Sequence, residues 1–580
     1  MAVSISKLLE LGAISECTPC DEQFISKIFL APKANGEKRF ILNLKPLNKF
    51  IPKLHFKMED YRTAARLIPK DGFMATIDLK EAYLILPISS SDRKYLRFQF
   101  QKDDNGNDSL FEFSALPYGL SVAPRTFTKL MREVTTYLRS RGFTSVIYLD
   151  DILCIGENYE ECLSNVRETI SLLHCLGFVI NFSKSSLKPE QSCCFLGFVY
   201  DSRYMTISLT DKKRDNIAKL VKKFQTLRSC SIRDFAQLIG TLTAACPAVR
   251  YGWLYTKLLE RHKFLALQKY HSFDAKFKPS TDILPDLEWW AQHIYSSCNT
   301  IGIQIFDQEI FTDASRTGWG AYSNNNRVNG GWTEGEQQFH INYLELLAIF
   351  LSLKSLARNS SDCAILLRVD NTTAISYINR MGGIQYPHLN NLAKKIWQWC
   401  EERKIWLFAS YINTNDNKDA DEESRKTINP DIEMSLSEEA FTKIVHRLGQ
   451  PEIDLFASRT NAKCDTYVSW KPDPDAISVD AFTQNWNRWF FYAFPPYSLI
   501  LKCLQKIMFD KSSGILVFPY WPSQPWFPLL KSMLSSEIII LNDEVQHIFS
   551  QRCPPAREHT LAAARLCGSR SLEEELRRLP

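Results

Sequence analysis

The stretch Val146-Ile147-Tyr148-Leu149-Asp150-Asp151-Ile152-Leu153-Cys154-Ile155 places two adjacent carboxylates between two short apolar runs. Apolar runs of this length on both sides of a polar pair predict a hairpin of two buried strands with the carboxylates at its tip. Neighbouring like charges in an apolar setting repel each other and lose solvation, and a divalent cation relieves both effects. An Asp-Asp pair also occurs in ordinary exposed turns, so the motif alone leaves both interpretations open.

A lone carboxylate and a tight turn precede this hairpin. Asp78 interrupts the strand-like run 73–88, and the segment 116–120 predicts a turn before a helix-like stretch over 125–131. In their order and spacing, these three motifs resemble the palm of a reverse transcriptase. The resemblance implies catalysis by two Mg²⁺ ions, with Mn²⁺ as a substitute, held by Asp78, Asp150 and Asp151, and places Tyr118 and Gly119 at the substrate.

The resemblance extends to segments around the palm. The run 33–48 looks like the fingers hairpin, in which Lys33 and Arg39 would hold the incoming triphosphate; two solvated surface cations are the alternative. Tyr83 matches a bulky position that blocks a ribose 2′-hydroxyl and so selects dNTPs, whereas a tyrosine packed in the core is the alternative. Lys184 matches a lysine near the pyrophosphate leaving group, and the hairpin that grips the primer end corresponds to Phe195, Leu196 and Gly197.

A second acidic set lies in the other half of the chain. The run 343–356 is apolar on most helical faces, so Glu345 is an anion on a buried helix and needs a partner or a metal ion. Asp313 and Asp370 each end a strand-like run, and Asp421 lies in a polar run; any one of these acids alone is also compatible with a solvated surface carboxylate. Together they resemble ribonuclease H, which implies metal-dependent cleavage of RNA in an RNA/DNA hybrid by Asp313, Glu345, Asp370 and Asp421.

One residue departs from that second family pattern. Relatives usually place a histidine a few residues before the final aspartate, where this chain has Tyr411-Ile412-Asn413-Thr414. A tyrosine cannot shuttle protons in its place at neutral pH, because the unperturbed pKa values of the two side chains differ by about 3.5 units. We therefore expect a complete metal site with reduced turnover.

Positive charge is concentrated between the two acidic sets. Residues 211–263 hold 12 Lys or Arg against 4 Asp or Glu, a net charge of +8, whereas the whole chain carries +5. A basic helical region after a palm suits a thumb that follows a duplex backbone by phosphate contacts. An ordinary solvated basic helix is the alternative, and the position of the region in the chain favours the thumb.

The C-terminal part shows a third alternation of strand-like and helix-like runs. The segment 450–545, with Phe494-Pro495-Pro496-Tyr497, resembles phage-type DNA adenine methyltransferases, in which a polar residue before Pro-Pro-Tyr holds the target amine of a flipped base. Phe494 cannot accept a hydrogen bond from that amine, and no convincing Gly-rich cofactor loop is present. We expect an inactive, structural or nucleic-acid-binding region.

The order of these regions resembles the polyprotein of DIRS-type (tyrosine-recombinase) retrotransposons. The resemblance implies these domains: 1–210 fingers and palm, 211–270 thumb, 271–305 connection, 306–428 ribonuclease H, 429–449 linker helix, 450–545 methyltransferase-like region and 546–580 tail. It implies an RNA template, a DNA primer, an RNA/DNA hybrid and dNTPs as partners. A tyrosine recombinase and a capsid protein would be encoded separately.

Composition sets the remaining bounds. A chain of 580 residues with 45% apolar content is long enough for several domains with real cores. No apolar run is long enough to span a membrane, and the scattered cysteines favour reduced thiols in an intracellular protein, with nucleus or cytoplasm unresolved. We expect a multidomain α/β and α+β protein: a right-hand polymerase, a ribonuclease H-like domain and a small degenerate methyltransferase-like domain. The alternative is a decayed or host-retained copy that binds nucleic acid without catalysis.

Overall fold

The computed structural model describes residues 1–32, 38–101, 108–426, 435–541 and 560–569. The chain divides into two compact units, residues 1–255 with 269–304, and residues 256–268 with 305–580. A search of the described helices finds none that is both long and apolar enough to cross a bilayer.

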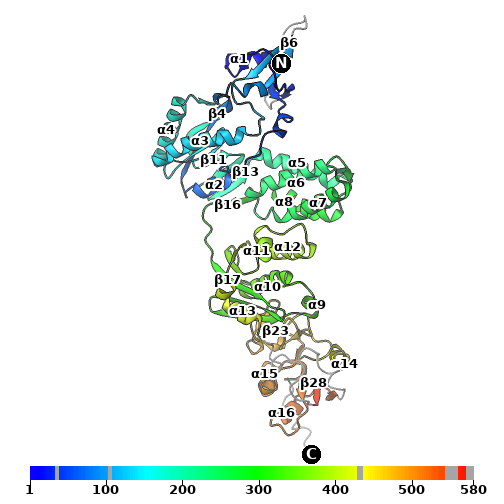
Figure 1. Cartoon of the computed structure of the whole chain (residues 1–580). Coiled ribbons are helices and arrows are strands. Elements are labelled where there is room, and N and C mark those ends of the chain that lie inside the picture. The colour runs from blue at the N-terminus through cyan, green and yellow to red at the C-terminus, as the bar shows by residue number, and fades with distance from the viewer. Residues whose placement is uncertain (33–37, 102–107, 427–434, 542–559, 570–580) are drawn as a thin grey trace, which may run out of the picture. The chain divides into compact units, whose positions relative to one another are not determined.

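An antiparallel sheet in the first unit carries the Tyr-Leu-Asp-Asp hairpin. Its strands lie in the order β10 (Ser186–Glu190), β4 (Phe73–Lys80), β8 (Asp151–Gly156) and β7 (Thr144–Tyr148), and β9 (Val179–Ile180) also pairs with β4. Helix α3 (Ala123–Ser140) packs against β7, and α4 (Tyr159–Cys175) packs against β8 (Figure 1). Ile77, Ile152 and Cys154, each at most 1% exposed, lie in the apolar core of this region. The predicted hairpin of buried strands is confirmed.

Smaller sheets complete the first unit before its helical part. The strands β1 (Ile14–Glu16), β6 (Asp108–Phe113) and β5 (Arg97–Gln101) form one sheet, and β2 (Ile28–Pro32) pairs with β3 (Lys38–Leu42). Another sheet has the order β11 (Ser192–Phe195), β12 (Phe198–Asp201), β13 (Thr206–Leu209) and β16 (Cys298–Thr300). Helices α1 (Ala2–Glu10) and α2 (Tyr61–Leu67) lie beside these strands in the sequence.

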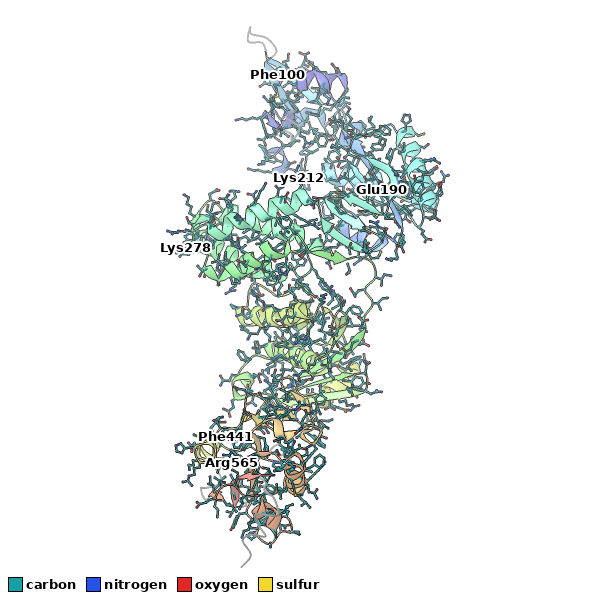
Figure 2. All side chains as sticks on the ribbon, turned by 180° about the vertical axis from the view of Figure 1, so that it is seen from behind. Phe100, Glu190, Lys212, Lys278, Phe441 and Arg565 are labelled. Atoms are coloured by element: carbon teal, nitrogen blue, oxygen red, sulfur yellow. The ribbon has the colours of Figure 1, made fainter. Side chains whose placement is uncertain are left out.

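The basic region after the palm is helical, as its pattern predicts. It contains α5 (Asp211–Thr226), α6 (Ile232–Ala245) and α7 (Lys257–Tyr270), and residues 256–268 belong to the second unit. Helix α8 (Leu284–His293) falls in the segment 271–305 and packs against α5. The exposed cations Lys212 and Lys278 lie on this part of the chain, while Phe441 and Arg565 lie in the C-terminal part (Figure 2).

The second unit begins with a mixed sheet covered by helices. Its order is β19 (Asn326–Gly331), β18 (Gly318–Ser323), β17 (Gln308–Ala314), β20 (Ala364–Val369) and β21 (Trp406–Tyr411), with β17, β20 and β21 parallel. The helices are α9 (Glu334–Gln337), α10 (Ile341–Leu356), α11 (Thr372–Asn379), α12 (Pro387–Glu402) and α13 (Lys418–Ser424). Helix α10 is buried along most of its length, as its apolar pattern predicts, because it contacts β17, β18 and α12.

A second sheet lies in the C-terminal part of this unit. Its order is β22 (Ile453–Asp454), β25 (Phe491–Ala493), β26 (Ser513–Pro519), β28 (Leu561–Cys567) and β27 (Ile539–Leu541). The first three strands are parallel, and β28 runs antiparallel to both of its neighbours. Helices α14 (Glu438–Leu448), α15 (Ile500–Asp510) and α16 (Phe527–Ser532) accompany the sheet, and β23 (Val468–Ser469) pairs with β24 (Ser478–Val479).

The prediction of a tail after residue 545 is wrong for residues 561–567, which form a strand of this sheet. Residues 561–567 form β28, in which Ala562, Ala563 and Ala564 are each fully buried between β26 and β27. Alanine has low β propensity, so the run carried no strand signal, and the sheet places it by burial instead.

Helix α14 begins later than the predicted linker helix. It is capped by Ser437, whose side chain accepts the N–H of Ala440.

A buried asparagine fixes the base of the Tyr-Leu-Asp-Asp hairpin to α4. Asn165 is 1% exposed, and its amide donates to the carbonyl oxygens of Thr144 (2.7 Å) and Ile155 (3.0 Å), which are cross-strand partners in β7 and β8. We expect Asn165→Ala to lower the free energy of unfolding of the first unit by about 2 kcal/mol, because two buried carbonyls lose their donor. Urea denaturation measures the loss. The exposed Ser164→Ala on the same helix is the control, and equal stability of the two variants would contradict the role of Asn165.

Candidate functional site

The turn between β7 and β8 holds two of the three predicted polymerase carboxylates. Leu149 and Asp150 form the two-residue loop, and Leu149 adopts a left-handed backbone with φ of 54°. A left-handed leucine costs roughly 1–2 kcal/mol, and its side chain packs against the palm core, which holds it there. Asp151 lies directly opposite Asp78 on β4, and the carbonyl of Asp150 accepts the N–H of Leu79 at 2.9 Å. The register therefore brings the three residues together.

Polar groups from a distant loop surround Asp78. The amide of Asn181 donates to Asp78 Oδ1 at 2.7 Å, Lys184 Nζ lies 3.8 Å from the same oxygen, and Ser185 Oγ accepts the Asp78 N–H at 3.0 Å. Burial, with the nearby charges of Asp150 and Asp78, raises the pKa of Asp151 to about 6. The cluster resists full ionisation without a cation. Lys184 was predicted near this site, whereas Asn181 and Ser185 were not.

The predicted nucleotide-binding residues form a stacked pair beside the hairpin. The rings of Tyr83 and Tyr118 stack with centroids 5.0 Å apart, and burial, with the charge of Asp150, raises the pKa of Tyr83 to about 12. Gly119 has φ of 94°, and its carbonyl accepts a hydrogen bond from Asn48 at 2.9 Å. Asn48 also accepts the N–H of Ser121 at 2.8 Å, so it braces this loop from outside the palm.

Of the two cations predicted to bind the triphosphate, the structure describes Arg39 but not Lys33. Arg39 lies on β3, is exposed, and acts electrostatically on Tyr118, whose pKa burial raises. Lys33 lies outside the described residues.

The predicted primer hairpin is a tight turn between β11 and β12. Leu196 and Gly197 have φ of 50° and 73°, and Phe195 pairs with Phe198. A side chain at Gly197 would collide with the Lys213 ammonium, which lies 4.7 Å from the centroid of the Phe198 ring. The turn thus packs directly against the start of α5.

Three carboxylates meet at the edge of the β17 sheet in the second unit. Asp313 is the penultimate residue of β17, Asp370 follows β20, and Glu345 lies in the second turn of α10. Oxygens of these three residues all lie within 4.8 Å of one another, the one such set of three or more His, Cys, Asp or Glu side chains in the part of the chain that is described. Two parallel strands and a buried helix therefore build a candidate metal centre.

Glu345 is the member of this set that most needs a partner for its side chain. It is 5% exposed, and its Oε2 atom is buried without a hydrogen-bond partner in the structure. Burial, followed by the charges of Asp313 and Asp370, raises the pKa of Glu345 to about 9. A buried oxygen without a partner, on a side chain that lies beside two other carboxylates, fits a divalent cation, because a metal ion supplies the missing partner and cancels the repulsion.

Helix α13 supplies the polar contacts around Asp313. Gly320 is the cross-strand partner of Asp313, and a side chain there would collide with the backbone of Ala420 and Ser424. Because Gly320 has no Cβ, α13 packs against β18 and Ser424 Oγ donates to Asp313 Oδ2 at 2.6 Å. Ser424 was not predicted from the sequence.

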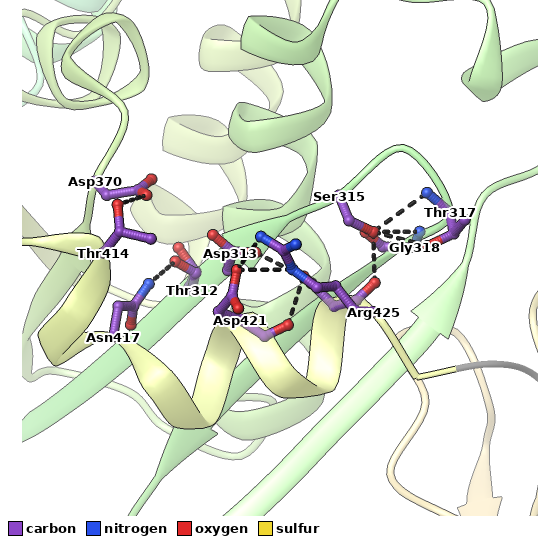
Figure 3. Close-up of polar contacts among 11 residues, drawn as sticks. Thr312, Asp313, Ser315, Thr317, Gly318, Asp370, Thr414, Asn417, Asp421 and Arg425 are labelled. Atoms are coloured by element: carbon purple, nitrogen blue, oxygen red, sulfur yellow. Dashed lines mark hydrogen bonds and ion pairs between the residues drawn. The ribbon is translucent and has the colours of Figure 1, made fainter.

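The fourth predicted acid, Asp421, lies on α13 beside this set but outside the group of three. Its Oδ1 accepts hydrogen bonds from Arg425 at 2.6 and 2.9 Å (Figure 3), and its charge contributes to the raised pKa of Asp313. Where relatives place a histidine, Thr414 Oγ1 donates to Asp370 Oδ2 at 2.9 Å (Figure 3). The turn therefore orients Asp370 but offers no imidazole.

Comparisons with known proteins agree with the first unit. Residues 31–200 match the family model of reverse transcriptase (RNA-dependent DNA polymerase). The genome polyprotein of Petunia vein clearing virus is 23% identical over 368 residues, 61% of this chain and 16% of that polyprotein. The enzymatic polyprotein of Cauliflower mosaic virus is 24% identical over 449 residues, 73% of this chain and 60% of that polyprotein. A Tf2-3 transposon polyprotein of Schizosaccharomyces pombe is 23% identical over 220 residues, 38% of this chain and 16% of that polyprotein.

The chain thus spans less than two thirds of the length of these relatives. Among solved structures, the foamy viral protease-reverse transcriptase with double-stranded DNA is 16% identical, with a TM-score of 0.46, over 70% of this chain and 69% of that one. The same protein with an RNA/DNA hybrid is 17% identical, with a TM-score of 0.45, over 74% and 56%. Residues 31–200 are thus similar to reverse transcriptase domains, within a chain similar to viral and transposon polyproteins.

Proposed function

We propose that this chain is an RNA-directed DNA polymerase that also cleaves the RNA strand of RNA/DNA hybrids. The register that sets Asp78 opposite Asp151, with Asp150 in the adjoining turn, carries the polymerase assignment. These residues would hold two Mg²⁺ ions, which would activate the primer 3′-hydroxyl and neutralise the triphosphate. The hydrogen bond from Asn181 keeps Asp78 oriented. Arg39 and Lys184, with Lys33, would bind phosphate oxygens of the incoming dNTP and the leaving pyrophosphate.

The metal centre of the second unit supports the hybrid-cleaving activity. Asp313, Glu345 and Asp370 would hold the metal ions with Asp421 as a further ligand, and such ions generate a water nucleophile and stabilise the leaving oxygen. Ser424 and Thr414 hold the carboxylates of Asp313 and Asp370 in place. Because Asn413 and Thr414 offer no general base at neutral pH, we expect turnover below that of relatives that have a histidine.

The rest of the chain fits the polyprotein of a DIRS-type retrotransposon. The exposed cations of α5 would contact duplex phosphates, and the primer end would rest on Phe195, Leu196 and Gly197. Phe494 is 4% exposed and packs in an apolar cluster with Tyr492 and Phe441, which supports a methyltransferase-like region without activity. A separately encoded tyrosine recombinase and capsid protein would complete the element.

The first test is dNTP incorporation on a primed RNA template with Mg²⁺. We expect Asp150→Asn/Asp151→Asn to lower the rate by about a thousandfold or more while hybrid cleavage persists, because the two centres use separate carboxylates. Asp313→Asn is the reciprocal control and should remove cleavage alone. A folded chain that binds hybrids in a salt-dependent way but incorporates no dNTP would instead be a nucleic-acid-binding copy without catalysis.

Sugar selection by Tyr83 is a separate prediction. We expect Tyr83→Ala to raise incorporation of ribonucleotides relative to dNTPs by about tenfold or more, because the smaller side chain leaves room for a 2′-hydroxyl. Competition between the two nucleotide classes on one template measures the ratio. Tyr118→Ala is the control from the same stacked pair, and an unchanged ratio in Tyr83→Ala would assign Tyr83 to packing alone.

The raised pKa of Glu345 makes the stability of the metal-free chain depend on pH. Its pKa rises from 4.5 to about 9 on folding, so between these values the folded state holds a proton that the unfolded state has lost. Stability of the metal-free chain should therefore fall as pH rises through this window, and Glu345→Gln should abolish that contribution. At pH 8, Mg²⁺ should raise the midpoint of thermal unfolding more in the wild type than in the variant, which keeps the carboxylates of the first unit but loses one ligand of the second. An equal rise in both would remove Glu345 from the metal site.

A further inference from the structure

One segment of the C-terminal region holds α10 near both of its ends. We call residues 459–476, which lie between β22 and β24 and include β23, the clamp segment. Residues of this segment contact the stretch just before α10 and the last turn of that helix. Helix α10 carries Glu345, so the segment contacts the element that completes the carboxylate set.

Arg459 forms the first anchor, before α10 begins. Its guanidinium donates to Glu336 Oε1 and Oε2 at 2.8 and 2.9 Å and to the carbonyl of Gly331 at 3.3 Å. The Arg459 and Glu336 side chains are only 14% and 18% exposed. Glu336 also accepts the N–H of Thr333 at 2.8 Å and so caps α9. One partly buried ion pair therefore ties the end of β19 and all of α9 to the clamp segment.

The second anchor lies at the other end of α10. Lys354, in the last turn of the helix, forms an ion pair with Asp475 at 2.6 Å, and Arg358, just beyond the helix, donates to the carbonyl of Ala476. The two anchors are joined inside the segment. Asp473 accepts the N–H of Arg459 at 3.1 Å and the hydroxyl proton of Tyr467.

Helix α10 needs such restraint because of what it carries. Glu345 is buried beside Asp313 and Asp370, and oxygens of all three side chains must stay within 4.8 Å of one another to share a cation, so a small shift of the helix away from the β17 edge would separate them. A partly buried, bidentate arginine pair resists that shift in a way that an exposed lysine pair does not, since its geometry is fixed and its loss leaves a partly desolvated carboxylate without a partner.

We propose that the clamp segment positions α10 for metal binding, with Arg459 as the positioning residue. This gives the C-terminal region a mechanical role in hybrid cleavage that requires no methyltransferase chemistry. The inference rests on the proposed ribonuclease H activity, although the positioning of α10 itself is measurable without it.

The test compares Arg459→Ala with Arg447→Ala in the full chain, since Arg447 is an exposed arginine of the same C-terminal region, on α14. Glu336→Gln, which keeps an amide oxygen for the Thr333 N–H, is the second variant. Hydrogen–deuterium exchange of residues 341–356, Mg²⁺ titration of hybrid cleavage, and dNTP incorporation are measured on each protein.

We expect Arg459→Ala and Glu336→Gln to speed exchange in residues 341–356 by about tenfold and to raise the Mg²⁺ concentration for half-maximal cleavage, because α10 is freed. Excess Mg²⁺ should restore much of the cleavage, hybrid KM should stay constant, and incorporation should be unchanged. Arg447→Ala should match the wild type.

Unchanged exchange and unchanged Mg²⁺ dependence in Arg459→Ala would overturn the proposal. A general loss of both activities, with faster exchange throughout the second unit, would also overturn it, because Arg459 would then serve folding alone. If the wild type cleaves no hybrid, the ribonuclease H assignment fails, and exchange in α10 still decides whether the clamp segment holds the helix.

Discussion

Electrostatic repulsion among neighbouring carboxylates is the constraint on which both units depend. In the first unit it lies between β4 and the β7–β8 turn, and in the second it lies where β17, β20 and α10 meet. Burial, followed by the charges of the neighbouring carboxylates, raises the pKa of Asp151 in the first set and of Glu345 in the second. Carboxylates would not stay this close to one another in an unfolded chain, so the surrounding fold must hold them together.

The two units meet this constraint with different partners. Around Asp78 the partners are donors on one short loop, Asn181 and Lys184, which leaves the cluster partly open. In the second unit, Ser424 and Thr414 each donate to one carboxylate, while Glu345 keeps a buried oxygen without a partner. The first site is therefore shaped by a polar loop beside the strands, and the second by a buried helix that is held from outside.

The local pattern and the family resemblances pointed to the acids, but nothing in the sequence pointed to the groups that orient them. The apolar runs around Asp150 and Asp151 and the all-round apolar helix of Glu345 are visible within a dozen residues of sequence. Asn181 lies 103 residues from Asp78 and Ser424 lies 111 residues from Asp313, and no periodicity links such pairs. Strand β28 was missed for another reason: its alanines carry little strand propensity and are placed by burial between β26 and β27.

The position of β28 also sets an order for synthesis. It fills the gap between β26 and β27, so this sheet cannot close until a ribosome has translated past Cys567. Because β22, immediately before the segment that grips α10, belongs to the same sheet, the Glu345 helix emerges well before its full set of restraints exists. A nascent or prematurely terminated chain could thus fold the sheet of the first unit while its second carboxylate set still lacked support. The two sets of carboxylates would form one after the other during translation.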